Sequence, residues 1–233
     1  FNALENVMLP LEIGGDDDPR RTAQKIMEKV DYSNIKVKKP WGSEYLIYQN
    51  NDIAVWLLKI IKGQNTSLHC HPAKKTGLIL LTGEASVELG FYETKKLKAP
   101  AKVMIRPGLF HSTKALSEDG ITVLELETPV DKEDLVRYKD EYGREEKPYE
   151  GKESMVDLTK DDIIFSEPEN KRALEYNFNS TKVTIEKHIN TEGIINRSKD
   201  TIIAVIDGGM ISKNGSFVLC PGDIVYPETI NKL

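Results

Sequence analysis

The 233-residue sequence predicts an all-β protein. Short runs rich in Leu and β-branched residues recur along the chain, separated by Gly, Pro, Asn and Asp, which is typical of the strands and turns of a sandwich or barrel. A second observation is a weak internal repeat. The segments Thr76–Gly83 and Thr201–Gly208 have the same length, and each is followed by a Pro-Gly pair, at Pro107-Gly108 and at Pro221-Gly222. We therefore expect a tandem duplication of one small β unit.

Eight runs are expected to form strands: Ala54–Ile61, Thr76–Leu81, Ala85–Leu89, Lys102–Ile105, Thr122–Leu126, Lys182–Ile185, Thr201–Ile206 and Ser216–Leu219. Three segments break this pattern. Pro19–Val30 has apolar residues at helical spacing after three aspartates, and Asp131–Tyr142 is a charged stretch that predicts a short surface helix. Gly143–Asn170, rich in Glu, Lys and Pro, predicts a connector between two halves.

These segments divide the chain into four parts. The expected parts are an N-terminal segment with a short helix (1–35), a first barrel (36–130), a helical and charged connector (131–172) and a second, degenerate unit (173–233).

Composition excludes several classes of protein. The formal charge is −5, and no block of like charge is long enough to follow a phosphate backbone, so we expect no nucleic-acid partner. The longest apolar runs, such as Val55–Leu58, are far short of the roughly 20 residues that span a bilayer, so we expect no membrane partner. Two cysteines do not make a disulfide framework, and no apolar core follows a basic start. A cytoplasmic protein is expected.

Three of the four histidines form a pattern. His69 and His71 are two residues apart, which on a strand places both imidazoles on one face and turns Cys70 to the other. His111 follows a Pro-Gly turn about 40 residues later, beside another apolar run. Two imidazoles on one strand and a third from elsewhere make a metal-site arrangement that suits borderline divalent ions. The plainer interpretation, polar residues satisfied in the core or at the surface, holds more readily for a single histidine than for three.

These residues resemble the motifs of the cupin superfamily of small β-barrels. Gly63-x5-His69-x-His71-x4-Thr76-x6-Gly83 is similar to the first motif, with Thr76 where the family has Glu, and Gly108-x2-His111 is similar to the second. The resemblance implies two tandem jelly-roll barrels, a bicupin, with His69, His71 and His111 around a metal ion in the first. Zn is the ion expected first, with Fe, Ni, Co and Mn as alternatives, and the fourth ligand is open because Thr76 replaces the glutamate.

A narrower resemblance is to type II phosphomannose isomerases and the cupins of sugar-nucleotide clusters. It rests on Lys39-Pro-Trp-Gly42 and on the string Asp134-Leu-Val-Arg-Tyr-Lys-Asp-Glu-Tyr-Gly-Arg144. Those isomerases carry Gln in place of His69, and an Arg-Ala-Glu-His run where this chain has Lys74-Lys75-Thr76-Gly77. The resemblance implies a small-molecule carbohydrate substrate.

The second half lacks the histidines of the first. Aligning the halves on Gly208 places Ile194 and Asn196 where the first half has His69 and His71, and aligning on Gly222 places Val225 where it has His111. The second half also ends one strand earlier, which would leave an open sheet edge. We expect the N-terminal segment or a partner subunit to supply that strand, so a homodimer is predicted.

Candidate residues around the metal fall into two groups. Glu125 and Glu127 alternate on an expected strand and face the same side, where one could serve as a general base next to a metal-polarised carbonyl, unless both face solvent. Candidate substrate-binding cations, which could hold a phosphate, are Lys74, Lys75, Arg106 and Arg144. For the lysines the simpler interpretation is a solvated surface side chain.

Three functions from different classes follow. The first is a metal-dependent sugar-phosphate or nucleotide-sugar isomerase or epimerase, similar to mannose-6-phosphate isomerase, in which Glu125 or Glu127 moves a proton. The second is a non-haem Fe(II) dioxygenase, favoured by three neutral imidazoles without a carboxylate. The third is a non-catalytic sugar-binding protein, favoured by the imperfect motifs.

Overall fold

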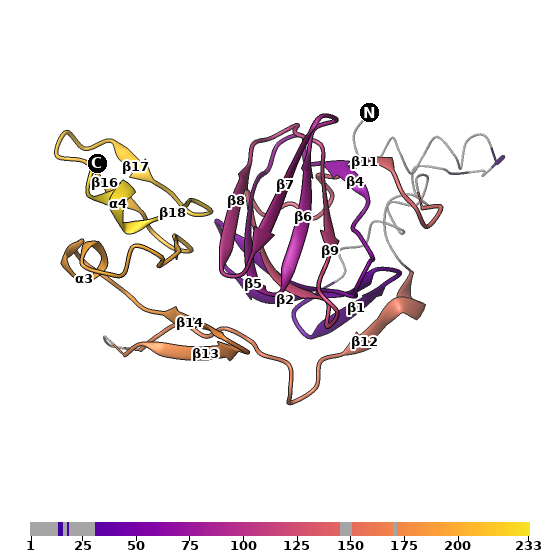
Figure 1. The fold of residues 1–233 in the computed structure, drawn as a ribbon, viewed down its shortest axis with the longest axis horizontal. Coiled ribbons are helices and arrows are strands. Elements are labelled where there is room, and N and C mark those ends of the chain that lie inside the picture. The colour runs from indigo at the N-terminus through magenta and orange to yellow at the C-terminus, as the bar shows by residue number, and fades with distance from the viewer. Residues whose placement is uncertain (1–13, 16–17, 19–30, 145–150, 170–171) are drawn as a thin grey trace.

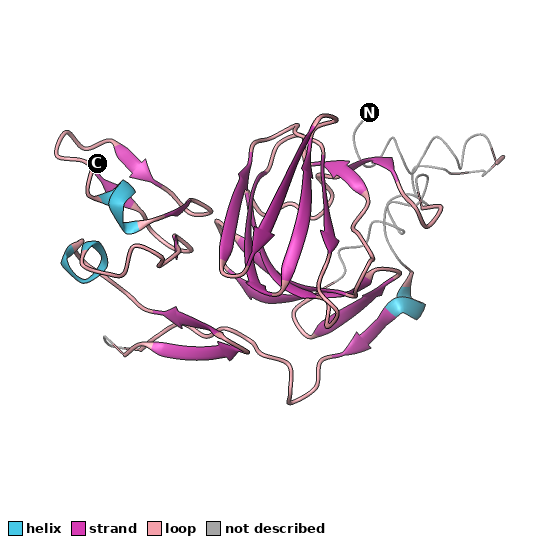
Figure 2. Ribbon diagram, in the orientation of Figure 1, coloured by secondary structure: helices cyan, strands magenta, loops and turns pink. Residues whose placement is uncertain are grey.

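The computed structural model describes residues 14–15, 18, 31–144, 151–169 and 172–233 (Figure 1). The expected helix at 19–30 lies outside these residues. None of the helices in the described ranges has the length and apolar character needed to cross a bilayer. The predicted all-β class is confirmed, since strands dominate the described chain (Figure 2).

Two antiparallel sheets form a barrel. The seven-stranded sheet has the order β12-β1-β2-β3-β10-β5-β8, and the five-stranded sheet has the order β11-β4-β9-β6-β7. The strands of the first are β12 (Met155–Asp157), β1 (Ile35–Lys39), β2 (Gly42–Gln49), β3 (Ala54–Ile60), β10 (Ile121–Thr128), β5 (Lys75–Thr82) and β8 (Ala101–Ile105). Those of the second are β11 (Val136–Lys139), β4 (Leu68–Cys70), β9 (His111–Ala115), β6 (Glu84–Leu89) and β7 (Glu93–Lys98).

The barrel interior is filled from both sheets. Trp56, Leu58 and Leu78 of the seven-stranded sheet share one buried cluster with Val87 and Leu89 of the five-stranded sheet. Because inward-facing residues alternate along each strand, the two sheets bury their facing sides against each other.

The rest of the chain follows the barrel as short elements. These are η1 (Lys152–Ser154), β13 (Leu174–Phe178), β14 (Thr181–Ile185), α3 (Glu192–Ile195), β15 (Ile203–Ala204), β16 (Met210–Ile211), β17 (Phe217–Leu219), β18 (Ile224–Val225) and α4 (Pro227–Ile230). The strands pair as three two-stranded sheets, β13-β14, β15-β18 and β16-β17. The degenerate second barrel stays a prediction.

This C-terminal part covers the outer face of the seven-stranded sheet. Phe178 and Ile224 pack into a second buried cluster with Leu57, Leu81 and Leu126, which alternate with the inward-facing residues of their strands. The sheet is therefore buried on both faces, and its central strands are nearly continuous apolar runs.

The expected surface helix over 131–142 is wrong. Residues Val136–Lys139 form β11, which pairs with β4 and extends the five-stranded sheet by one edge strand. The edge of β4 has unpaired backbone groups that offer this segment a ladder of hydrogen bonds. A helix supported by only three apolar residues at helical spacing is less stable than this pairing.

Candidate metal centre

Pairing of β4 with β9 brings the three histidines together. His69 and His111 are directly opposite each other in the register, and His71 follows immediately after β4. Cys70, between the two histidines, is buried on the opposite face, as the two-residue period requires. The ring centroids of His69 and His111 are 4.3 Å apart, and that of His71 lies 5.1 Å from His69 and 5.4 Å from His111.

Each imidazole is oriented by a backbone carbonyl. Nδ1 lies 2.8 Å from Ser67 O in His69, 2.6 Å from Asp134 O in His71 and 3.1 Å from Leu109 O in His111. A carbonyl only accepts hydrogen bonds, so each Nδ1 carries the proton and each Nε2 keeps a lone pair. A hydrogen bond from the other ring nitrogen is the usual support of a metal-binding histidine.

Two of these lone pairs have no hydrogen-bond donor in the protein. Nε2 of His71 and Nε2 of His111 are buried without a hydrogen-bond partner, and their residues are only 5% and 2% exposed. Burial lowers the pKa of all three imidazoles: that of His71 falls to about 4, with Lys74 contributing, and those of His69 and His111 also lie below 6.5. Neutral rings with buried, unused lone pairs fit a divalent metal ion.

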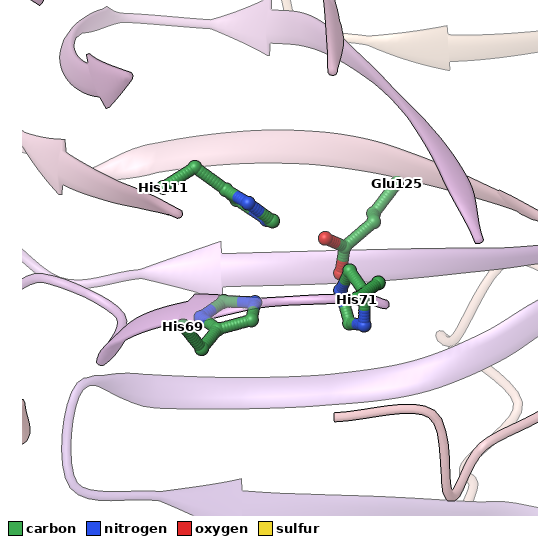
Figure 3. Close-up of side chains that lie close together, drawn as sticks. All are labelled: His69, His71, His111 and Glu125. Atoms are coloured by element: carbon green, nitrogen blue, oxygen red, sulfur yellow. The ribbon is translucent and has the colours of Figure 1, made fainter. Parts of the chain in front are cut away.

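Glu125 brings a fourth potential ligand atom to the three histidines. A carboxylate oxygen of Glu125 and one ring nitrogen from each of His69, His71 and His111 all lie within 4.8 Å of one another (Figure 3). Glu125 is on β10, in the opposite sheet from the histidines, so the group joins the two sheets. Burial raises the pKa of Glu125 to about 8, with Glu127 and Glu44 adding to the effect, and a bound cation would displace that proton.

Glu125 offers the carboxylate that position 76, occupied by Thr, lacks. Thr76 on β5 is directly opposite Glu127 on β10, and Glu125 is opposite Leu78, which faces the interior. The interior side of β10 therefore presents carboxylates next to the place where Thr76 offers only a short hydroxyl. Sequence reasoning identified Glu125 as a candidate base but missed it as a ligand.

Glu127 lies beside the ligand group and is held by Lys74. Lys74 Nζ donates a hydrogen bond of 2.8 Å to Glu127 Oε1, and the same oxygen lies 3.6 Å from Nε2 of His71. Lys74 is 1% exposed, so its side chain is part of the interior and not of the surface. Burial alone would raise the pKa of Glu127, but Lys74 and Lys132 outweigh it and the pKa lies below its ordinary value.

A second buried ion group lies further along the same cavity. Glu44 accepts from Lys132 at 3.0 Å and is 3.3 Å from Lys39, and the Lys132 ammonium lies 3.5 Å from the centre of the Trp56 ring. Although burial opposes ionisation, the two lysines lower the pKa of Glu44 to about 2. Glu44 and Lys132 were not singled out from the sequence, where isolated charges look like solvated residues, and Lys39 was noted only as the start of the Lys39-Pro-Trp-Gly42 string.

The remaining candidate cations differ in whether they line the cavity that contains the three histidines. Arg144 lines the cavity and is paired with Asp140 at 2.7 Å. Lys75 points to a different cavity, where it pairs with Asp223 of the C-terminal part at 2.7 Å. Arg106 is exposed in the turn before Gly108. Of the four predicted substrate-binding cations, Lys74 and Arg144 are brought to the metal centre; Arg137, in register with His69, is an additional one.

No family model and no curated protein matches this sequence. Among solved structures, an uncharacterized Klebsiella pneumoniae protein with a double-stranded β-helix domain is 20% identical over 42% of this chain and 84% of its own, with a TM-score of 0.39. KdgF from a Halomonas species is 19% identical over 40% and 84%, with a TM-score of 0.37. Oxalate decarboxylase of Lactobacillus farciminis, in complex with formate, is 16% identical over 44% and 32%, with a TM-score of 0.40.

Proposed function

We propose that this chain is a cupin enzyme that moves a proton between adjacent carbons of a small anionic substrate, in the manner of a sugar-phosphate isomerase. The observation that carries the proposal is an ionised carboxylate, Glu127, 3.6 Å from an unused imidazole lone pair of His71.

The metal would be held by His69, His71, His111 and Glu125. Three imidazoles and one carboxylate suit Zn first, and Fe, Ni, Co or Mn as alternatives. A divalent ion in this place supplies Lewis acidity to a substrate carbonyl or hydroxyl.

Glu127 is the proposed proton carrier. An isomerisation removes a proton from the carbon next to a carbonyl and returns it to the neighbouring carbon, which one carboxylate can do in both directions. The Lys74 ammonium holds Oε1 of Glu127 in place and keeps the carboxylate ionised and ready to accept the proton. In this assignment Glu125 and Glu127 have different roles: one is a ligand and the other is the base.

The cavity supports a small reacting group with a negative charge. Its volume is about 70 Å³, which is room for on the order of five water molecules, so it accepts the reacting carbons while a larger substrate extends through the mouth. Five cationic side chains line it against three carboxylates, and a divalent ion would add to the positive field, which favours an anion such as a phosphate ester.

The dioxygenase hypothesis loses the argument from three imidazoles without a carboxylate, because Glu125 lies within 4.8 Å of the ligand atoms of all three rings. A carboxylate among imidazoles also suits non-haem Fe(II), so this hypothesis remains an alternative that the experiment below tests. The sugar-binding hypothesis becomes an outcome of the experiment below.

The experiment is solvent deuterium exchange. Protein loaded separately with Zn²⁺, Co²⁺, Ni²⁺, Mn²⁺ or Fe²⁺ is incubated in D₂O with aldose and ketose phosphates, and deuterium at the carbon next to the carbonyl is followed by NMR. Glu127→Gln is expected to keep its metal and lose about 10²–10⁴-fold in exchange rate. Glu125→Gln is expected to lose metal, and Glu88→Gln, exposed on the outer face of β6, is the control.

Three results would contradict the proposal. Metal-loaded protein that binds the sugars without any exchange would be a sugar-binding protein, and oxygen uptake by the iron form would make it a dioxygenase. Exchange at the wild-type rate in Glu127→Gln would remove Glu127 from the reaction.

We also propose that residues 173–233 descend from the same β unit as the first barrel. Two pairs of glycines support this interpretation: Gly83 and Gly208 both have positive φ, and so do Gly108 and Gly222, each directly after a proline. In both halves the Pro-Gly turn leads into a strand, β9 and β18. A homodimer is proposed as well, and light scattering of the purified protein tests it.

A further inference from the structure

One segment crosses from the end of the seven-stranded sheet to the edge of the five-stranded sheet. We name residues 131–144 the strap. It contains β11, and Leu135, Arg137 and Arg144 of the strap line the metal cavity. The strap is therefore a wall of the site as well as an edge strand.

Asp134 connects the strap to the metal centre by its backbone and its side chain. Its carbonyl accepts the Nδ1–H of His71 at 2.6 Å. Its carboxylate accepts the backbone N–H groups of Ala73, at 3.0 and 3.1 Å, and of Lys74, at 2.8 Å. The side chain thus fixes the turn after His71, and this fixes where the carbonyl of Asp134 can lie.

Other contacts hold the strap on both sides. On the cavity side, Arg137 Nε donates to Ser67 Oγ at 3.2 Å, next to the carbonyl that orients His69. On the outer side, the Tyr138 ring lies 5.2 Å from that of Phe91 and 5.6 Å from that of Phe110, the residue before His111.

The far end of the strap is anchored as well. The Tyr142 hydroxyl donates to Gln64 Oε1 at 2.8 Å, and the Arg144 side chain pairs with Asp140 within the strap. The strap is thus held at several points around the ligand group: Arg137 is paired with His69 in the backbone ladder, and the Asp134 carbonyl accepts a hydrogen bond from the ring of His71.

We infer that Asp134 is a positioning residue for the metal, and that metal binding and closure of the strap are coupled. This inference rests on the metal site of the proposed function. Coordination at Nε2 withdraws electrons from the imidazole and makes its Nδ1–H a stronger donor, so the bond to the Asp134 carbonyl strengthens when the metal is present. Coupling between two sites is reciprocal, so a strap that raises metal affinity is itself held more firmly by the metal.

The first test uses the wild-type protein. Amide hydrogen exchange of the strap is measured with Zn²⁺ bound and after chelation, and the amides of β11 are expected to exchange more slowly with Zn²⁺. Unchanged exchange in the strap, with one equivalent of Zn²⁺ bound, would overturn the inference while the metal site of the proposed function stands. No retained metal would overturn both.

The second test changes the anchor. Asp134→Asn keeps the shape but loses the charge and one acceptor, and it places an amide donor against the N–H groups of Ala73 and Lys74. The backbone carbonyl that orients His71 remains, but the turn that places it is no longer fixed by the side chain. Disturbing a partner that orients a ligand weakens metal binding by about 10–100-fold, and competition with a chelator is expected to show a loss in this range. The visible absorption spectrum of the Co²⁺ form is expected to change, because the ring of His71 is held less firmly.

The matched control is Glu133→Gln, which removes a charge one residue earlier in the strap. Its Zn²⁺ affinity and Co²⁺ spectrum are expected to equal those of the wild type, and circular dichroism establishes that both variants are folded. Wild-type affinity and an unchanged Co²⁺ spectrum in folded Asp134→Asn would show that Asp134 only holds the strap and would overturn the positioning role. Because none of these readouts uses turnover, a failure of the proton-transfer proposal is detected separately.

Discussion

The two sheets of the barrel differ in what covers them. The seven-stranded sheet is buried on its inner face by the barrel core and on its outer face by the C-terminal part. The five-stranded sheet leaves much of its outer side to solvent: β7 is almost entirely exposed, and Phe91, Tyr92 and Tyr138 are exposed aromatic residues. One sheet is the structural centre of the molecule, and the other carries the histidines.

The difference shows how a reactive site and a stable core coexist in one small barrel. The histidines come from the sheet with fewer packing demands, while Glu125 and Glu127 project from β10 of the well-covered sheet, whose outer face holds Leu124 and Leu126 in the second buried cluster. The carboxylates are thus fixed by packing behind them, and the imidazoles by the hydrogen bonds that they donate to backbone carbonyls. The following predictions test this division, from the largest expected effect to the smallest.

The core of the covered sheet is expected to be the most sensitive. Leu126→Ala removes a side chain that is 1% exposed from β10, and truncation of a buried leucine costs about 2–5 kcal/mol in free energy of unfolding. Urea unfolding measures the loss. Glu88→Ala, on the exposed face of β6, is expected to change it by less than about 0.5 kcal/mol. Equal losses in the two variants would refute the division between the sheets.

Metal binding is expected to stabilise the protein, because the ligands come from both sheets. At a free Zn²⁺ concentration of about 100 times the dissociation constant, the wild-type protein gains about 2.7 kcal/mol in free energy of unfolding. His111→Ala and the double variant His69→Ala/His71→Ala are expected to lose this gain and the bound metal, measured by mass spectrometry of the elements, while keeping the fold. Stoichiometric metal in the double variant would show that the site lies elsewhere.

Acid is expected to weaken the buried ion group of the covered sheet. The pKa of Glu44 is lowered to about 2 in the folded protein. Its contribution to the free energy of unfolding is therefore complete above the ordinary carboxyl pKa and is lost as the pH falls toward 2. For an ordinary value of 4.5, the loss between neutral pH and about pH 3 is about 2 kcal/mol. Unfolding of wild type and Glu44→Gln over this pH range measures it; an identical pH dependence in both would rule Glu44 out as the cause.

The same division explains what could be predicted from the sequence. Strands such as β3 and β5, buried on both faces, are apolar runs and were predicted within two residues. β7, with its exposed sequence ETKKLK, and β4, with three residues, have no readable period, and β11 was mistaken for a helix.

In the candidate site, too, the residues with a local pattern were predicted and the long-range relations were not. His69 and His71 were recognised because their two-residue spacing is local, and His111 because histidine is rare in this chain and follows a Pro-Gly turn there. The ligand role of Glu125 depends on the register of β10 against β5 and β3, and the burial of Lys74 depends on Glu127, 53 residues away. Such long-range relations leave no mark on a single sequence.

The smallest expected effect tests how closely the C-terminal part is seated on the covered sheet. Gly77 on β5 has no side chain where Ile224 of β18 approaches: a Cβ added there would lie 2.4 Å from Ile224 Cδ1. Because that methyl is the flexible end of a side chain, Gly77→Ala is expected to cost only about 1 kcal/mol in free energy of unfolding. Ile224→Val removes the methyl that clashes, so the double variant is expected to recover part of that cost. A double-mutant cycle in urea measures this coupling, and strictly additive effects would show that β18 does not rest on Gly77 in solution.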